Sequence, residues 1–264
     1  MSEPVRIWWQ SFVDPDRNEA YFELLSASLN ERAREGTHVD VRGLSPPDRW
    51  FGRLTEFRCA ALAIDNALEA AEQGYDAFAL GHFQDPGLYE ARSAVDLPVV
   101  GLGEATLHWA AQLGRRIALV SIDPVFDVWH REQADLYGLR DRVSHVAGLG
   151  ALVEDFEPAF AGDAAAHERL RARFRELAEP LVADGADVIV PAGALPALLL
   201  AEHGARVAHA PVVDSVAVLL KCTEAAVELH RLTGLGPSRG PSFARASTEA
   251  IAEFRELLRR GRTH

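Results

Sequence analysis

The sequence predicts an α/β protein with two similar parallel-sheet lobes related by a pseudo-twofold, and an active site in the cleft between them. Two observations support this prediction. Short apolar runs, of the length of buried strands, alternate with longer segments whose apolar residues recur at helical spacing. The chain also resembles itself when it is shifted by about 110 residues, as a duplicated lobe would. We therefore expect a first lobe of residues 1–103 plus 215–264, and a second lobe of residues 104–214.

In the first lobe, apolar runs too short for globular helices predict the strands, and longer periodic segments predict the helices. The expected strands are residues 5–9, 39–41, 77–81 and 97–102, and the expected helices are residues 17–35, 54–73 and 87–94. Asp85 and Pro86 supply a hydrogen-bond acceptor and a fixed φ where the helix at residue 87 begins. Segment 43–52 contains two prolines and a Trp-Phe pair, and is a loop long enough to act as a lid.

The second lobe repeats the alternation of strands and helices. The expected strands are residues 117–122, 143–146, 188–191 and 210–213, and the expected helices are residues 125–137, 164–183 and one from 195. A helix from 216 and a terminal one over 243–260 are expected in the part of the chain that returns to the first lobe. The matches across the repeat are Arg6-Ile7 with Arg116-Ile117, Ser11 with Ser121, Gly74-Tyr75-Asp76 with Gly185-Ala186-Asp187, and Pro98-Val99-Val100 with Pro211-Val212-Val213. On this alignment His82 matches Gly193. Because ligands bind beyond the carboxyl ends of parallel strands, these two loops are expected to face each other across the interlobe cleft.

Charge and composition narrow the classes of partner. The formal net charge of −12 and the pI near 5.3 argue against nucleic acid and against an anionic membrane as the main partner. No apolar run approaches the length of a membrane span, and the first residues show no signal-peptide pattern. We expect a cytoplasmic protein with a small-molecule substrate, and the sequence leaves a homo-oligomer open.

No metal and no cofactor is expected. Cys59 and Cys222 cannot by themselves form a disulfide framework or a zinc site, and both fall in apolar-periodic segments, as buried helix residues do. The histidines show no recognised metal spacing. The glycine-containing stretches lack the strand-GxGxxG-helix context of a nucleotide site.

Two neighbouring stretches of the first lobe carry a resemblance to a known family. The residues concerned are Phe83, Asp85-Pro86-Gly87, Pro98-Val99-Val100-Gly101 and Glu104-Ala105. These residues and their spacing resemble the aspartate/glutamate/hydantoin racemase superfamily, and hydantoin racemases in particular. The first catalytic segment of hydantoin racemases reads roughly Cys-Phe-x-Asp-Pro-Gly. The resemblance implies two facing α/β lobes and a cofactor-independent isomerase that acts on a small carboxylate or a hydantoin-like cyclic amide.

The chain departs from the family at both reactive positions. Racemisation removes a proton on one face of a carbon and returns one on the other, so that two acid/base groups must flank that carbon. The resemblance implies one cysteine per lobe, but His82 stands at the first position and Gly193 at the second. A decarboxylase branch of the superfamily keeps only the second cysteine, so the chain does not fit that pattern either.

His82 is therefore the candidate catalytic acid/base, because histidine titrates near neutral pH. The candidate substrate-binding residues are Gln10, Ser11, Phe83, Asp85, Ser121, Ala192, Gly193 and Ala194. The serines offer hydroxyl donors, and the small residues 192–194 offer backbone N–H groups at a helix start. A serine at such a place is also a common turn or capping residue, and His82 can equally bond a neighbouring carbonyl and pack under Phe83.

The function predicted is that of an isomerase or racemase on a small carboxylate or hydantoin-like substrate. Two alternatives stay open at this point: a hydrolase or lyase acting on a related carbonyl compound, and a non-catalytic descendant that binds small anions.

Overall fold

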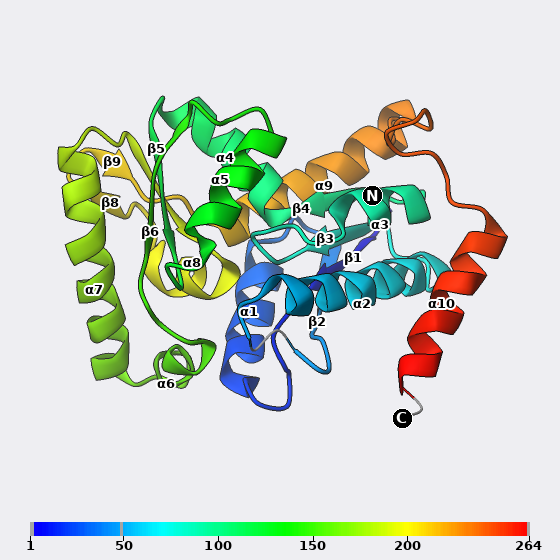
Figure 1. The fold of residues 1–264 in the computed structure, drawn as a ribbon, viewed down its shortest axis with the longest axis horizontal. Helices are drawn as coiled ribbons and strands as arrows, with labels where there is room; N and C mark the ends of the chain where they lie inside the picture. Colours follow the sequence, from blue (N-terminus) through cyan, green and yellow to red (C-terminus); the bar gives the residue numbers. More distant parts are fainter. Residues whose placement is uncertain (1–2, 48–49, 263–264) are drawn as a thin grey trace.

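The computed structural model describes residues 3–47 and 50–262, and its main strands form two separate parallel sheets (Figure 1). The first sheet has the order β2-β1-β3-β4, and the second has the order β6-β5-β7. The strands of the first sheet are β1 (Val5–Gln10), β2 (Thr37–Arg42), β3 (Ala77–Leu80) and β4 (Val99–Gly101). Those of the second are β5 (Ile117–Ser121), β6 (Val143–Gly148) and β7 (Val188–Ala192). The parallel α/β class predicted from the sequence is confirmed.

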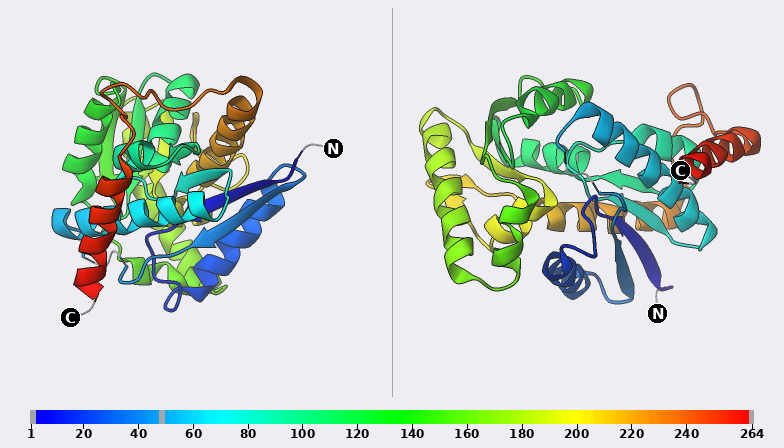
Figure 2. Two further views of the ribbon diagram at one scale, coloured as in Figure 1. Left: turned by 90° about the vertical axis from the view of Figure 1, so that its right-hand side faces the viewer. Right: turned by 60° about the horizontal axis from the view of Figure 1, so that its bottom comes forward.

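Helices cover both sheets, and the C-terminal part of the chain returns to the first. The helices are α1 (Glu19–Arg32), α2 (Arg53–Glu72), α3 (Leu88–Ala94), α4 (Leu102–Leu113), α5 (Phe126–Leu136), α6 (Glu157–Phe160), α7 (Ala164–Ala183), α8 (Ala194–Leu200), α9 (Ser215–Thr233) and α10 (Thr248–Arg262), with a short 3-10 turn at Val153–Asp155. Helix α9 packs against β3, β4 and α4, and α10 lies against α2 (Figures 1 and 2). In the part of the chain that the structure describes, no helix is long and apolar enough to span a bilayer.

The two sheets are built in the same way, down to individual hydrogen bonds. Ile7 is in register with Ala77 in the first sheet, and Ile117 is in register with Val188 in the second. The Asp76 carboxylate accepts from the N–H of Arg6 at 2.8 Å. In the second sheet Asp187 accepts in the same way from backbone N–H groups at residues 115 and 116, at 3.0 Å. The repeat seen in the sequence is therefore a repeat of strand order and register. The lobe boundaries at residues 103 and 214 stay a prediction.

Besides the short helix α6 and the 3-10 turn before it, which have no counterpart in the prediction, three elements differ from the sequence prediction. Helix α4 was not predicted, because Gly101 and Gly103 break the apolar pattern where it starts. The expected strand 210–213 is split: β9 (Ala210–Pro211) pairs antiparallel with β8 (Arg206–Val207), and Val212 makes an isolated parallel bridge to Ile189. The terminal helix begins at Thr248, where the Ser247 hydroxyl accepts from the N–H of Ala250 at 3.1 Å.

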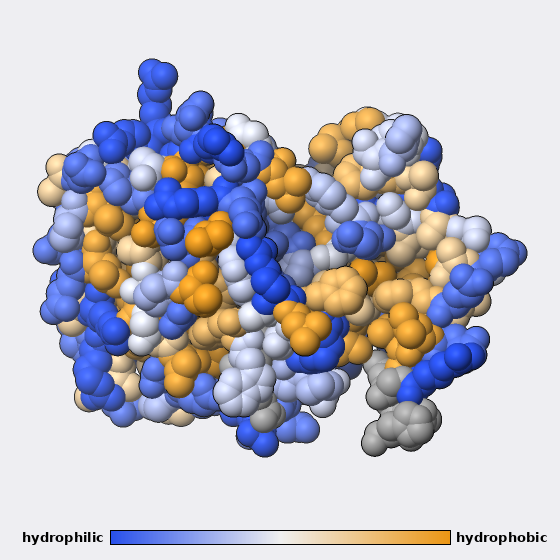
Figure 3. Space-filling model, in the orientation of Figure 1, coloured by the Kyte–Doolittle hydropathy of each residue, from blue (hydrophilic) through white to orange (hydrophobic). Residues whose placement is uncertain are grey.

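One large cluster of buried apolar side chains runs through both sheets, and a smaller one fills the space between the first sheet and helices α2 and α3. Apolar side chains also reach the surface of α2 and α5, and hydrophobic patches interrupt the charged surface on the face seen in Figure 3. They border an open groove lined by residues that include Phe57, Trp129, Leu136 and Phe254. The continuous core fixes the two sheets against each other, and so positions the ends of their strands.

Candidate active site

The carboxyl ends of strands from both sheets meet at one small cavity of about 60 Å³. Ser11 follows β1 and His82 follows β3, whereas Ser121 ends β5 and residues 192–194 join β7 to α8. This is where a parallel α/β sheet is expected to bind its ligand. Because the space is small, the ligand must be a small molecule.

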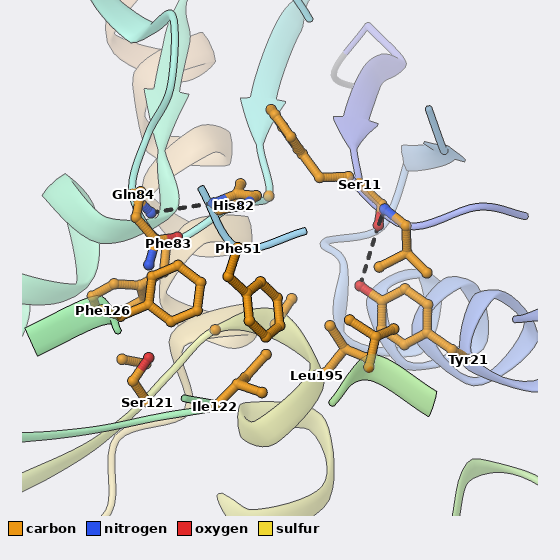
Figure 4. A pocket seen from close by; sticks show the side chains of 17 residues that line it. Ser11, Tyr21, Phe51, His82, Phe83, Gln84, Ser121, Ile122, Phe126 and Leu195 are labelled. Atoms are coloured by element: carbon orange, nitrogen blue, oxygen red, sulfur yellow. Dashed lines mark hydrogen bonds between the residues drawn. The ribbon is translucent and has the colours of Figure 1, made fainter. Parts of the chain in front are cut away.

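Most of the cavity wall is apolar, and four phenylalanines contribute to it (Figure 4). Phe51 comes from the loop expected to act as a lid, and its ring centroid lies 4.9 Å from that of Phe126. Next to this loop, the Arg53 guanidinium lies over the Trp129 ring at 4.7 Å and pairs with Glu132 on α5. The end of the loop is thereby tied to α5, and Phe51 forms part of the cavity wall. Among the lining residues that the structure describes, none is lysine or arginine.

His82 is half-buried in the cavity wall. Its Nδ1 accepts a hydrogen bond from the N–H of Gln84 at 3.3 Å, and the Phe12 ring packs against it edge-on with centroids 4.5 Å apart. An Nδ1 atom that accepts a hydrogen bond carries no hydrogen, so the neutral ring holds its proton on Nε2. Phe83, the next residue, is buried and also lines the cavity.

Ser11 is bonded to a tyrosine from the neighbouring helix. Its Oγ lies 3.4 Å from the hydroxyl of Tyr21 on α1, and the N–H of Val13 donates to the same Oγ at 3.4 Å. Tyr21 is fully buried, and burial raises its pKa to about 12. Its hydroxyl therefore stays protonated at neutral pH and serves only as a neutral hydrogen-bonding group.

Ser121 is bonded instead to a histidine that the sequence analysis did not single out. The Nε2 atom of His130 on α5 lies 3.1 Å from Ser121 Oγ, and its Nδ1 lies 3.3 Å from Gln133 Oε1. His130 is fully buried, and burial lowers its pKa to about 4, so the ring is neutral at pH 7. The sequence repeat offers a signal for His130, because His130 follows Ser121 by nine residues much as Tyr21 follows Ser11 by ten.

Residues 192–194 form the turn into α8 at the cavity. Gly193 has φ +147°, a value that L side chains rarely adopt, and an added Cβ would lie 3.1 Å from Pro196. The first bond within α8 runs from the N–H of Ala197 to the carbonyl of Gly193 at 3.1 Å. The N–H groups of Ala194 and Leu195 precede that bond, and so have no acceptor within the helix.

Two of the predicted binding residues, Gln10 and Asp85, do not line the cavity. Both are buried, and both hold loops that do line it. Gln10 Oε1 accepts from the indole N–H of Trp8 at 3.0 Å and from the side-chain amide of Asn66 at 2.8 Å. Asp85 lies at the start of α4, where the N–H groups of residues 103 and 104 donate to its carboxylate at 3.0 and 2.6 Å.

The position of Asp85 explains why glycine stands at residues 101 and 103, at the start of α4. A Cβ at Gly101 would lie 2.6 Å from an Asp85 oxygen, and a Cβ at Gly103 would lie 2.0 Å from the carbonyl oxygen of Phe83. The hydroxyl of Tyr137 also donates to Asp85, at 2.7 Å. Burial raises the Asp85 pKa to about 7 in spite of these donors. The glycine pair thus serves to bring α4 close to the loop that carries His82.

The cysteines lie on helices, as predicted. Cys59 is fully buried on α2, Cys222 is half-buried on α9, and neither lines the cavity. Among the residues that the structure describes, no group of three or more His, Cys, Asp or Glu side chains is placed to hold a metal ion.

Comparison with known proteins shows the family of this chain. The family model described as Asp/Glu/Hydantoin racemase matches residues 12–223. A hydantoin racemase from Pseudomonas sp. (strain NS671) is 30% identical over 222 residues, which cover 84% of this chain and 86% of that protein. A solved allantoin racemase from Klebsiella pneumoniae has a TM-score of 0.77 and 26% identity over 92% of this chain and 94% of its own.

The allantoin racemase from Pseudomonas fluorescens has a TM-score of 0.72 over 92% of this chain and 97% of its own. Its identity of 23% shows likeness of fold alone. The matching family model and the hydantoin racemase relative, which extends over most of both chains, show more than the fold. The chain therefore belongs to the Asp/Glu/hydantoin racemase family, and is an enzyme of its isomerase class.

Proposed function

We propose that this chain is a cofactor-independent racemase of small cyclic ureides of the hydantoin type, with His82 as one of its acid/base groups. The observation that carries the proposal is the cavity itself. It is small and mostly apolar, it contains hydroxyl groups and one half-buried histidine, and no lysine or arginine is among its described lining residues.

The residues of the cavity wall favour an uncharged cyclic ligand over a free amino acid, which carries a carboxylate. Proteins commonly hold a carboxylate with arginine or lysine, because charge-assisted hydrogen bonds are the stronger ones. A hydantoin ring is uncharged and presents two carbonyls and two N–H groups. The hydroxyls of Ser11 and Tyr21 suit those groups, and the phenylalanine rings suit a flat ring. Two of the similar proteins are a hydantoin racemase and an allantoin racemase, which is consistent with this substrate class.

His82 has the means to move the proton. The ring carbon that bears the side chain lies next to a carbonyl, so removal of its proton leaves an enolate. His82 accepts that proton as a neutral base, or donates one as the conjugate acid, while hydroxyl and backbone N–H donors stabilise the enolate oxygen. Phe51 and Phe126 pack together at the cavity wall, and such apolar surroundings strengthen these interactions.

Exchange of the ring proton for deuterium tests the proposal. Wild-type protein in D₂O is incubated with single enantiomers of allantoin, of hydantoins that carry one side chain, and of aspartate and glutamate. We expect exchange with loss of optical activity for the cyclic ureides and neither for the amino acids, after subtraction of the uncatalysed rate. Activity on the amino acids alone, or no exchange with any of them, would show the proposal to be wrong.

One observation favours a second candidate, hydrolysis of the ring. The hydrogen bond between Ser121 and His130 resembles the one between a nucleophile and its general base in hydrolases. Gln133 bonds the other ring nitrogen, Nδ1, and so orients the imidazole. Ring opening would yield an N-carbamoyl amino acid without exchange of the ring proton into recovered substrate. The same incubations distinguish the two reactions when the products are separated by chromatography.

A further inference from the structure

Racemisation by proton transfer needs a second acid/base group, and Gly193 has no side chain to supply it. We propose that Ser121, activated by His130, is the second acid/base group and acts on the face of the ring opposite His82. This inference rests on the proposed racemase function and deepens it, because it assigns both proton-transfer groups.

The hydrogen bonds around Gln133 fix the direction of the Ser121–His130 bond. The Gln133 amide nitrogen faces two acceptors, the carbonyl oxygen of Phe83 and, at 3.4 Å, a carboxylate oxygen of Asp85. Its oxygen must therefore face His130, where Nδ1 donates to it. The neutral imidazole then has no hydrogen on Nε2, so Nε2 accepts the hydrogen of the Ser121 hydroxyl.

This arrangement makes Ser121 a proton acceptor toward the cavity. Its hydrogen points to His130, so the oxygen can take a proton from a ligand as its own hydrogen passes to Nε2. Gly103 is needed for the arrangement, because a Cβ there would lie 2.2 Å from the Gln133 amide nitrogen. Burial keeps the His130 ring neutral, and so leaves one ring nitrogen without a hydrogen, but it also makes the ring a weaker base than an exposed histidine.

Ser121 and His82 come from different sheets and approach the cavity from different sides. Ser121 ends β5, whereas His82 follows β3. In Figure 4 both side chains are drawn at the cavity, with His82 above and Ser121 below in that view. A flat ring between the two groups would present one face to each.

The protons balance in both directions. In one direction the ring proton passes to Ser121 Oγ, the Ser121 hydrogen passes to His130 Nε2, and protonated His82 gives a proton to the other face. In the reverse direction neutral His82 takes the ring proton, and His130 returns its hydrogen through Ser121. Each turnover moves one proton between the two histidines, and exchange with solvent restores the starting form.

The matched serine of the first half cannot act in this way. Ser11 is bonded to Tyr21, whose hydroxyl already carries a proton and gains no second one at neutral pH. We therefore assign Ser11 and Tyr21 to binding of a ring carbonyl, and Ser121 to catalysis with His130 as its positioning residue.

Proton exchange measured separately for each enantiomer tests the assignment. In Ser121→Ala we expect racemisation of allantoin and of a substituted hydantoin to fall by about 100-fold or more. The enantiomer that His82 deprotonates should still exchange its proton in D₂O, and the other should not. His82→Asn should show the opposite preference, and His130→Gln should show the preference of Ser121→Ala. Ser121→Cys, which keeps an acid/base group there, should retain inversion.

Two serines serve as controls. Ser144→Ala should leave both rates unchanged, because the Ser144 hydroxyl bonds the carbonyl of Ile117 away from the cavity. Ser11→Ala should slow the exchange of both enantiomers alike. Racemisation by Ser121→Ala within about threefold of wild type, or equal loss of exchange for both enantiomers, would overturn the assignment. So would ring opening that Ser121→Ala abolishes, because Ser121 would then be a nucleophile. Wild-type protein that exchanges no substrate would overturn the proposed function, and this inference with it.

Discussion

The pairs Ser11–Tyr21 and Ser121–His130 occupy matching places in the two halves, yet their chemistry differs. In each pair a serine at the end of the central strand bonds a side chain on the helix that follows, at 3.4 Å in the first half and 3.1 Å in the second. Burial acts on both partners, but it keeps tyrosine protonated and leaves histidine as an unprotonated base. A duplicated geometry thus gives a binding group in one half and an acid/base group in the other.

The loops after β3 and β7 also differ, but here the first half carries the acid/base side chain and the second half does not. The first presents His82, whereas the matching position of the second is Gly193, whose φ of +147° is a conformation that L side chains rarely adopt. We therefore assign one acid/base group to each half. In the first half it is His82, which follows β3, and in the second it is Ser121 with His130, at the end of β5.

The largest effect is expected at His82. His82→Asn keeps a hydrogen-bonding side chain at the end of β3 but cannot exchange protons, so racemisation should fall by ~100 to 10,000-fold. Polarimetry with a substituted hydantoin measures the loss. His38→Asn is the matched control, because His38 is exposed on β2 and bonds only Asp40 among the contacts resolved for it. Activity of His82→Asn within about threefold of wild type would remove His82 from the mechanism.

The next effect is a change of stability with pH that comes from His130 and has no counterpart at Tyr21. The folded-state pKa of His130, about 4, is below the ordinary value of 6.5, so the unfolded chain binds its proton more readily. This contribution to the free energy of unfolding is complete above pH 6.5 and is lost as the pH falls to about 4. Its size is on the order of 3 kcal/mol. Tyr21, whose pKa is raised to about 12, does not titrate over this pH range, so it adds no pH dependence to the free energy of unfolding.

Urea unfolding of wild type, His130→Gln and Tyr21→Phe between pH 4 and 7 measures this effect. We expect the difference between wild type and His130→Gln to shrink as the pH falls, and the difference for Tyr21→Phe to stay constant. Asp85, whose pKa is raised to about 7, contributes the opposite slope in all three proteins. Parallel curves for wild type and His130→Gln would mean that His130 is charged or solvated in the folded protein.

The sequence predicts the frame of this site well and its interior poorly. Short apolar runs and the repeated Gly-x-Asp turns locate the strands, because a strand buried on both faces is apolar throughout. The cavity positions of Ser11, His82, Ser121 and residues 192–194 follow from those strand ends. His130 and Gln133 do not, because polar residues on a helix usually face solvent and nothing local shows that these two are buried.

Asp85 and Gln10 are expected in the cavity from the sequence, but the structure turns both side chains away from it. They neighbour the strand ends, and only the packing of α4 and α2 shows which way their side chains turn. Asp85, with φ +51°, turns back to the start of α4, a helix that the sequence did not predict. A carboxylate that caps a helix and one that binds a substrate look alike in sequence.

The third effect concerns the matched glycine. Gly193→Ala or Gly193→Cys forces a side chain onto φ +147°, and should cost about 1–3 kcal/mol of stability. Thermal unfolding measures this cost. Gly236→Ala is the control, because the nearest atom to an added Cβ there is His230 Nδ1 at 4.0 Å. A fully stable Gly193→Cys protein would mean that the turn into α8 adapts, and that a thiol could stand opposite position 82.

The smallest effect on turnover is expected at the cysteines, and it tests whether a thiol supplies the proton transfer that we assign to His82 and Ser121. Cys59 is fully buried on α2 and Cys222 is half-buried on α9, where burial raises its pKa and so lowers the fraction of reactive thiolate. Cys59→Ala and Cys222→Ala should keep turnover within a few fold, and Cys59→Ala should cost about 1 kcal/mol of stability as a small core truncation. Iodoacetamide should inactivate the wild type slowly, and equally with or without substrate. Rapid inactivation that a hydantoin prevents, and that Cys222→Ala or Cys59→Ala abolishes, would place a thiol in the cavity and contradict the division of roles between the two halves.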